Sequence, residues 1–219
     1  STQLIIPGSQ GATGIRHMPS SELYGTGMDR DIPQPNETKE QMATKKNTGT
    51  KRVKAAQTQM HDTSNGLPKK TRVGIVELLN DRLADSVDLN LQMKQAHWNV
   101  KGPNFIGLHK LFDEIYEATE AYVDKIAERA VMLGGTVYGT ARAAVAGSDL
   151  PEYPRDISTG EAHVEAVTKA LAAYGTQVRN AIDKAEDMDD ADTADLFTEV
   201  SRGVDKWLWF VEAHGQARS

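Results

Sequence analysis

The sequence predicts an all-α protein built as a bundle of four long antiparallel helices. Apolar residues recur at spacings of three and four along four long segments of residues 69–219, and no segment shows the alternating pattern of a strand. Glycine and proline clusters separate these segments. With 219 residues, of which 39% are hydrophobic and 26% charged, the chain accommodates one sizeable domain and a tail, but no second full domain.

Residues 1–68 are predicted to form a mobile N-terminal arm ahead of the helical domain of residues 69–219. The arm is rich in Gly, Pro, Ser, Thr, Asn and Gln and has no sustained apolar period. It is basic from residue 42 onward, because residues 42–72 hold eight Lys or Arg and one acid. Residues 73–219 hold 14 basic and 25 acidic residues. We therefore expect the body to repel DNA and the basic part of the arm to attract it.

A lysine-rich run within the arm predicts contacts with phosphate groups. Such a run neutralises phosphates and releases counterions without reading the base sequence. The alternative is a tail that only increases solubility. The candidate DNA-binding residues are Lys45, Lys46, Lys51, Arg52 and Lys54.

The first two predicted helices are separated by one short turn. The first opens after Pro68 and continues through His97, until the Gly102–Pro103 pair stops it. The second begins near Asn104 and ends at the Gly134–Gly135 pair. The expected core residues are Val76, Leu79, Leu83, Val87 and Leu91 on the first helix, and Leu108, Leu111, Ile115, Thr119, Val123, Ile126, Ala130 and Leu133 on the second.

A long connection precedes the last two predicted helices. Residues 136–157 contain two glycines and two prolines, with one short helix predicted through ARAAVA. The third long helix starts with a capping box of Ser158 and Glu161, and the fourth starts among Asp189–Asp192. Their expected core residues are Val164, Val167, Leu171, Tyr174, Val178 and Ile182, then Leu196, Val200, Val204, Leu208 and Val211. One long connection between the second and third helices favours ferritin-like over simple up-and-down topology.

Four metal-capable side chains project from the second helix, and His97 ends the first helix beside them. His109 and Asp113 are four residues apart, as are Asp124 and Glu128, so each pair lies on one helix face. Eleven residues separate Asp113 from Asp124. All four side chains then fall within a stripe of about 100°, but the two pairs lie about 16 Å apart along the helix axis. One ion cannot span that distance.

Two arrangements are compatible with this spacing. Either the pairs are half-sites that bind no metal, or a second, antiparallel copy places Asp124 and Glu128 opposite His97, His109 and Asp113. A two-fold interface supplies the second arrangement. The Glu-x-x-His motif of intrasubunit di-iron bundles is absent, which favours the interface. Because the sequence has no cysteine, imidazole and carboxylate must hold any metal, and they suit iron, manganese or zinc.

The stretch AHWNVKGPNFIGLHKLFDEIYEATEAYVDKIAERAVMLGG resembles the signature of the Dps family, the DNA-binding proteins from starved cells, which are mini-ferritins. The stretch TADLFTEVSRGVDKWLWFVEAH extends the resemblance, so that it covers residues 70–214. It implies a hollow homo-dodecamer with ferroxidase centres at its two-fold interfaces. By position, His97, His109 and Asp113 of one subunit and Asp124 and Glu128 of its mate would bind iron.

The resemblance also implies a function. The protein would oxidise Fe(II), preferentially with hydrogen peroxide, store the ferric mineral in its cage and protect DNA from oxidative damage. Trp98 would lie near the metal and quench stray oxidising equivalents, or else pack at an interface. Asp190 and Asp195 are candidates for an acidic three-fold pore that admits iron, or else they complement the dipole and cap of a helix start.

Two other functions compete with iron oxidation. The protein could be mainly a nucleoid-compacting DNA binder that acts through its lysine-rich arm. It could instead be a structural cage whose site holds zinc or another divalent metal without turnover. No run of about 18 apolar residues and no signal-peptide pattern occurs, so we expect a soluble, cytoplasmic, nucleoid-associated protein with no membrane partner.

Overall fold

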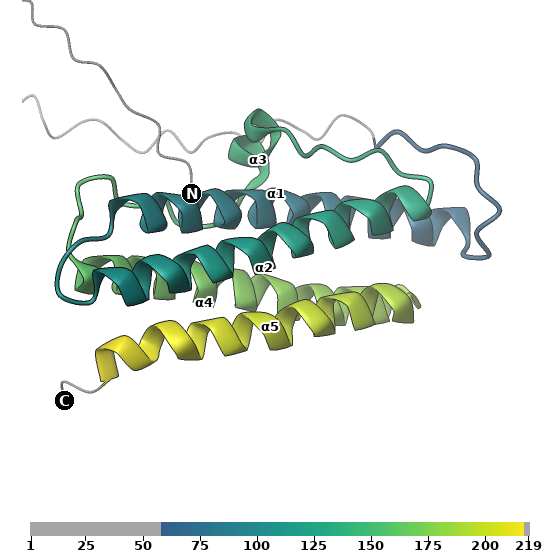
Figure 1. Cartoon of the computed structure of the whole chain (residues 1–219). Helices are drawn as coiled ribbons and strands as arrows, with labels where there is room; N and C mark the ends of the chain where they lie inside the picture. The colour runs from purple at the N-terminus through teal and green to yellow at the C-terminus, as the bar shows by residue number, and fades with distance from the viewer. Residues whose placement is uncertain (1–57, 217–219) are drawn as a thin grey trace, which may run out of the picture. The chain divides into compact units, whose positions relative to one another are not determined.

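The computed structural model describes residues 58–216, which form four long helices and one short helix (Figure 1). The helices are α1 (Lys69–Asn99), α2 (Phe105–Met132), α3 (Ala141–Gly147), α4 (Gly160–Asp187) and α5 (Ala191–Gln216). The described residues contain no strand, only isolated bridges between Met60 and Gly135 and between Lys101 and Thr159. The predicted all-α bundle is confirmed. None of these helices is both long and apolar enough to cross a membrane.

The long helices pack as two hairpins, α1 with α2 and α4 with α5 (Figure 1). The start of α4 is tied to the turn between α1 and α2, because Lys101 N donates to Ser158 O (2.9 Å) and Gly160 N donates to Lys101 O (3.0 Å). Thus α2 and α4 begin at the same end of the bundle and run parallel. Residues 136–159 cross its length, with α3 packed against α1. This confirms the single long connection that the sequence predicts.

The core lies along the facing stripes of the four long helices. The residues predicted for the core of α2, α4 and α5 are buried or half-buried. On α1 the prediction for Leu91 was wrong, because this side chain is 54% exposed. The buried stripe of α1 passes instead through Leu89, Met93 and Ala96, at steps of four and three residues, and Leu91 falls outside it.

Glycines end the first two helices as predicted. The turn after α1 contains Gly102 with a φ of 110°, and α2 is followed by Gly134 with a φ of 84°. A side chain would strain the backbone in this left-handed region, so glycine is favoured at both positions. A Cβ on Gly134 would also lie only 2.6 Å from the backbone oxygen of His61.

The N-terminal cap of α4 lies one residue later than predicted. Thr159, rather than Ser158, accepts a hydrogen bond from Ala162 N through its side chain (3.2 Å). Pairing of Lys101 with the Ser158 carbonyl holds Ser158 outside the helix. The start of α5 agrees with the prediction, since Asp190 accepts from Thr193 N (3.2 Å).

Residues 58–68, which we call the strap, lie against the end of α2. Backbone hydrogen bonds join His61 N to Gly134 O (2.6 Å) and Thr136 N to Gln59 O (3.1 Å). The strap is therefore joined to the helical body by backbone hydrogen bonds. The candidate DNA-binding residues lie outside the described residues; they are Lys45, Lys46, Lys51, Arg52 and Lys54.

Candidate metal centre

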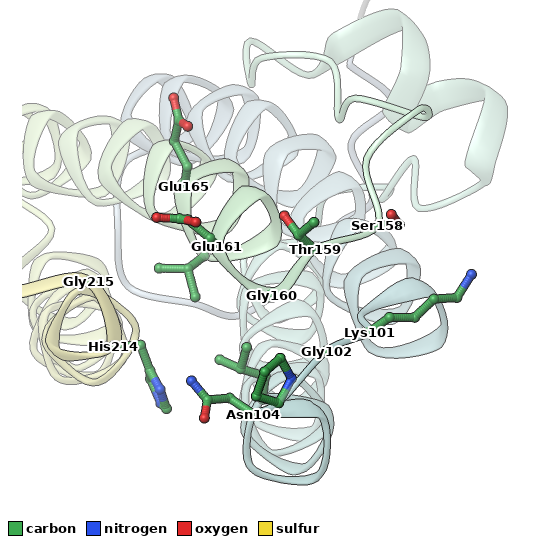
Figure 2. Close-up of a pocket in the computed structure, with 13 residues that line it drawn as sticks. Lys101, Gly102, Asn104, Ser158, Thr159, Gly160, Glu161, Glu165, His214 and Gly215 are labelled. Carbon is green, nitrogen blue, oxygen red and sulfur yellow. The ribbon is translucent and has the colours of Figure 1, made fainter. Parts of the chain in front are cut away.

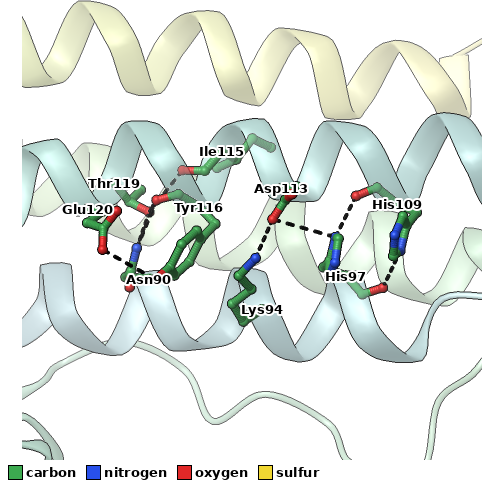
Figure 3. Close-up of polar contacts among 9 residues, drawn as sticks. All are labelled: Asn90, Lys94, His97, His109, Asp113, Ile115, Tyr116, Thr119 and Glu120. Carbon is green, nitrogen blue, oxygen red and sulfur yellow. Dashed lines mark hydrogen bonds and ion pairs between the residues drawn. The ribbon is translucent and has the colours of Figure 1, made fainter.

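The turn between α1 and α2 brings two predicted ligands face to face. His97 lies in the last turn of α1 and His109 near the start of α2. Their imidazole rings stack with centroids 3.7 Å apart and an interplanar angle of 22°. Figure 3 shows both rings in the space between the two helices. The short turn of residues 100–104 makes this approach possible.

Each of these rings is held by the backbone of the other residue. His97 Nδ1 lies 2.8 Å from His109 O, and His109 Nδ1 lies 2.8 Å from His97 O (Figure 3). A carbonyl oxygen only accepts, so Nδ1 carries the hydrogen in both rings. In the neutral imidazoles, Nε2 then keeps its lone pair. Backbone bonds of this kind orient metal-binding histidines and fix their tautomer.

Asp113 lies one helical turn beyond His109 and forms an ion pair with a lysine. Its Oδ1 accepts a hydrogen bond from Lys94 Nζ and lies 3.8 Å from His97 Nδ1. The hydrogen bond from Lys94 holds the pKa of Asp113 below its usual range, although slight desolvation opposes this. Lys94 also lies 4.3 Å from the centre of the Tyr116 ring. Sequence reasoning missed Lys94, because a protonated amine is not a metal ligand.

A polar contact in the middle of the hairpin fixes the rotation of α2 relative to α1. Asn90 Nδ2 donates to Tyr116 O (2.9 Å) and to Thr119 Oγ1 (3.0 Å) (Figure 3). Thr119 is buried, so this contact lies inside the hairpin. Asn90 precedes His97 by seven residues, which is about two helical turns. The contact therefore helps to keep His109 facing α1.

The other two predicted ligands lie farther along α2. Asp124 and Glu128 are both exposed. Since α2 is unbroken from Phe105 to Met132, Asp113 and Asp124 are separated by about 16 Å along its axis. Among the described residues, no group of three or more His, Asp or Glu could hold one metal ion. Within one subunit, His97 lies against His109 and near Asp113, whereas the predicted ligands Asp124 and Glu128 lie elsewhere on α2.

Large apolar side chains are exposed around the candidate centre. Leu91 and Trp98, seven residues apart on α1, are 54% and 68% exposed. Ile106, at the start of α2, is 60% exposed. Trp98 is therefore not packed within its own subunit. Clustered exposed apolar side chains are typical of surfaces that bind another protein.

The two candidate pore acids differ in their surroundings. Asp190 is only 2% exposed, forms an ion pair with Arg129 (2.7 Å) and accepts a hydrogen bond from Thr193 Oγ1 (2.6 Å). These contacts favour the capping role for Asp190. Asp195 is exposed on α5 and remains a candidate for the pore.

A separate cavity of about 430 Å³ lies at the end of the bundle where α4 begins (Figure 2). Leu108 and Val164 contribute apolar surface, and Lys101, Glu161 and His214 contribute polar groups. None of the predicted metal ligands lines it. This cavity is therefore distinct from the candidate metal centre.

Comparison with known proteins gives consistent matches. A family model for a ferritin-like domain matches residues 76–217. The DNA protection during starvation protein of Agrobacterium fabrum is 42% identical over 159 residues, which cover 73% of this chain and 98% of that protein. The solved structure of Mycobacterium smegmatis Dps in a tetragonal form has a TM-score of 0.67 at 35% identity, covering 71% of this chain and 94% of that one. DpsC from Streptomyces coelicolor has a TM-score of 0.68 at 28% identity, covering 71% and 91%.

Proposed function

Because the chain belongs to the Dps family of ferritin-like proteins, we propose that it oxidises Fe(II) and stores the ferric product inside a cage of identical subunits. The observation that carries this proposal is the mutual orientation of His97 and His109. Backbone carbonyls engage both Nδ1 atoms, so each ring keeps an Nε2 lone pair for metal binding, and the Asp113 carboxylate lies 3.8 Å from His97 Nδ1. Such nitrogen and oxygen ligands suit Fe(II).

The proposed centre is shared between two subunits related by a two-fold axis. His97, His109 and Asp113 of one subunit would face Asp124 and Glu128 of its mate. The long separation along α2 and the exposure of both acids support this arrangement. The exposed side chains of Leu91, Trp98 and Ile106 supply apolar surface for such an interface. Six such pairs would make the dodecamer.

The proposed reaction is the oxidation of substrate Fe(II), preferentially by hydrogen peroxide. Two Fe(II) ions each give one electron to one peroxide molecule, which takes up two protons and forms two water molecules. This consumes both reactants of hydroxyl-radical chemistry. Asp113 contributes a carboxylate that is already ionised, and iron must displace the Lys94 ammonium from it. His97 and His109 need no reorientation, because the backbone holds their rings.

The function is tested by adding Fe(II) without oxygen to the iron-free cage and then adding peroxide. We expect a rise in ferric absorbance with the wild type and a much smaller rise with His109→Ala. Particle mass should correspond to twelve subunits. An intact wild-type cage that binds metal and produces no ferric absorbance would instead support the alternative of a structural zinc cage.

Trp98 and Asp195 have supporting roles in this proposal. Trp98 would lie near the shared centre and give electrons to stray oxidants. Asp195 would attract Fe(II) to a three-fold pore, since three exposed carboxylates around one axis create a negative potential.

We also propose that the basic arm binds DNA phosphates and associates the cage with the nucleoid. The supporting observation is a contrast in charge: residues 42–72 contain eight Lys or Arg, whereas residues 73–219 have an excess of acidic residues. A gel-shift comparison of the full chain with a truncation that retains residues 58–219 tests this role. The full chain should bind DNA with a strong salt dependence, and the truncation should lose binding but keep iron oxidation. DNA binding that survives truncation would contradict the role of the arm.

A further inference from the structure

A buried tyrosine and histidine form a hydrogen-bonded pair outside the candidate metal centre. Tyr153, in the connection between α3 and α4, has its hydroxyl 2.7 Å from Nδ1 of His163 on α4. The two residues are 8% and 1% exposed. Their rings are nearly parallel, at 24°, with centroids 6.0 Å apart. Neither residue belongs to the proposed ligand set, so iron binding does not explain this pair.

The surroundings of His163 set the direction of the hydrogen bond. Burial lowers the pKa of His163, while the backbone carbonyl of Asn99 acts in the opposite direction. The ring is therefore neutral at physiological pH. Nε2 is buried and has no hydrogen-bond partner among the described residues. A phenol O–H is a stronger donor than a neutral imidazole N–H, and an unprotonated imidazole nitrogen is a stronger acceptor than a phenol oxygen, so Nδ1 accepts the hydrogen of the Tyr153 hydroxyl.

This geometry suits the loss of one electron from Tyr153. Burial raises the pKa of Tyr153, so its phenol stays protonated until the residue is oxidised. An oxidised phenol is a strong acid and must release its proton. His163 Nδ1, at 2.7 Å, can accept that proton without any movement of heavy atoms. The backbone of Asn99, which acts to raise the pKa of His163, would favour the resulting imidazolium.

The pair also lies near the candidate metal centre along the chain. Asn99, whose backbone acts to raise the pKa of His163, is the last residue of α1. It follows Trp98 directly and His97 by two residues. Consecutive Cα atoms are about 3.8 Å apart, so only a short stretch of backbone separates the pair from the proposed ligand.

We propose that the Tyr153–His163 pair is an internal electron donor that protects the cage from one-electron oxidants formed at the metal centre. Tyr153 gives one electron to a hydroxyl-radical-class oxidant and its phenolic proton to His163 Nδ1, and becomes a neutral tyrosyl radical. The oxidant takes that electron and a proton from solvent and forms water. An electron from Fe(II) later reduces the radical, and the proton returns from His163. This inference rests on the proposed iron oxidation.

A second buried tyrosine provides an internal control. Tyr174 is fully buried, and its hydroxyl lies 2.7 Å from Ser86 Oγ. A serine hydroxyl is not a base at this pH and cannot take the proton of an oxidised phenol. The same oxidant should therefore leave a stable radical at Tyr153 and not at Tyr174.

The test uses iron-free cages and tris(bipyridine)ruthenium(III) generated by a light flash, followed by freeze-quenched electron paramagnetic resonance. We expect a long-lived tyrosyl signal in the wild type and in Tyr174→Phe, and its loss in Tyr153→Phe. His163→Gln keeps a polar side chain but lacks the base, so it should also lose the signal. In the wild type itself, electron-nuclear double resonance should show an exchangeable hydrogen-bonded proton on the radical.

The same wild-type cages should then receive a little Fe(II) followed by excess peroxide. We expect the Tyr153 signal to appear again in the wild type. When the two variants receive the same treatment, mass spectrometry should find more oxidised peptide in Tyr153→Phe than in Tyr174→Phe. A wild-type cage without ferric absorbance contradicts the proposed function. Flash oxidation that leaves the same radical in Tyr153→Phe as in the wild type overturns this inference, whatever the iron chemistry shows.

Discussion

His97 and His109 are each held in place by the backbone carbonyl of the other, through two hydrogen bonds of 2.8 Å. Removing either imidazole therefore also removes the hydrogen-bond donor that satisfies the carbonyl beside the remaining ring. The carbonyl that holds the remaining ring stays in place, but the stacking between the two rings is lost, so the loss of one histidine should disturb the orientation of the other. Substitutions here test the geometry of the centre as well as its ligand count.

Mixed cages provide the sharpest test of a shared centre. His109→Ala and Asp124→Ala cages should each lack peroxide-dependent iron oxidation. At an interface between the two variants, one of the two centres keeps all its ligands, so a random one-to-one mixture should regain about one quarter of wild-type centres. Ferric absorbance measures this recovery, and native mass spectrometry establishes that mixed cages have formed. Mixed cages without any recovery would contradict the shared centre.

Replacement of Lys94 by methionine should strengthen metal binding at neutral pH. The Lys94 ammonium donates to Asp113 and is only 22% exposed, so a metal cation competes with it for one carboxylate. Its removal should tighten Co(II) binding by a factor on the order of ten. Without Lys94 the pKa of Asp113 rises toward its ordinary value, so this gain should shrink as acid protonates the carboxyl.

The matched control for Lys94 is Lys125→Met. Lys125 follows the proposed ligand Asp124 in the chain, but its ammonium forms an ion pair with Glu199 on α5. Co(II) affinity from calorimetry should be unchanged in this variant. If Lys94→Met binds Co(II) no more tightly than the wild type, then Lys94 does not compete with the metal.

The two candidate pore acids should respond differently to substitution by asparagine. Asp190→Asn weakens the pair with Arg129, which is 13% exposed, and should cost about 3 to 5 kcal/mol of stability. Asp195→Asn changes an exposed side chain and should alter stability by less than about 0.5 kcal/mol while slowing iron uptake. Thermal unfolding and the initial rate of iron oxidation separate the two effects. If Asp190→Asn slows iron uptake without lowering stability, then the pore role of Asp190 is favoured over the capping role.

The sequence predicts the helices well, because they follow from periodicity, whereas the metal ligands stay a prediction. The spacing of four residues between His109 and Asp113 places them on one face wherever a helix forms, and the structure has that helix. Leu91 was misplaced because α1 has apolar residues on both sides of its buried stripe. The N-cap of α4 was misplaced because a tertiary contact holds Ser158 outside the helix. The sequence pattern around Ser158 does not predict that contact.

The side-chain contacts described above join residues that lie far apart in the sequence, so they depend on how the helices and loops pack together. The hydrogen bonds between His97 and His109 require the turn of residues 100–104 to bring each Nδ1 within 2.8 Å of the carbonyl oxygen of the other residue. The Tyr153–His163 pair joins a loop to a helix and has no ligand-like spacing. The Asp113–Lys94 pair joins two helices. Sequence periodicity predicts which residues share one face of a helix, but it does not predict which residues of the neighbouring helix contact them.

Truncation within the strap should affect stability, whereas truncation before it should not. Removal of residues 1–57 leaves the backbone pairing of His61 with Gly134 in place. Removal of residues 1–68 also removes Met60 and Leu67, which pack on the core, and should cost about 2 to 4 kcal/mol. Denaturant unfolding of the two truncations measures the difference. Equal stability would show that the strap does not support the bundle.

Alkaline pH should destabilise the fold through its buried tyrosines. Burial raises the pKa of Tyr174, of Tyr153 and of Tyr122, whereas unfolded tyrosine ionises near pH 10. The unfolded chain therefore releases these protons first, and stability should fall as the pH rises above about 10. Tyr174→Phe removes one such group, so its stability should fall less steeply between about pH 8 and pH 11. Ser86→Ala removes the same hydrogen bond but keeps the phenol, so its curve should be no shallower than that of the wild type. If the wild-type and Tyr174→Phe curves are parallel, then ionisation of Tyr174 does not contribute to alkaline unfolding.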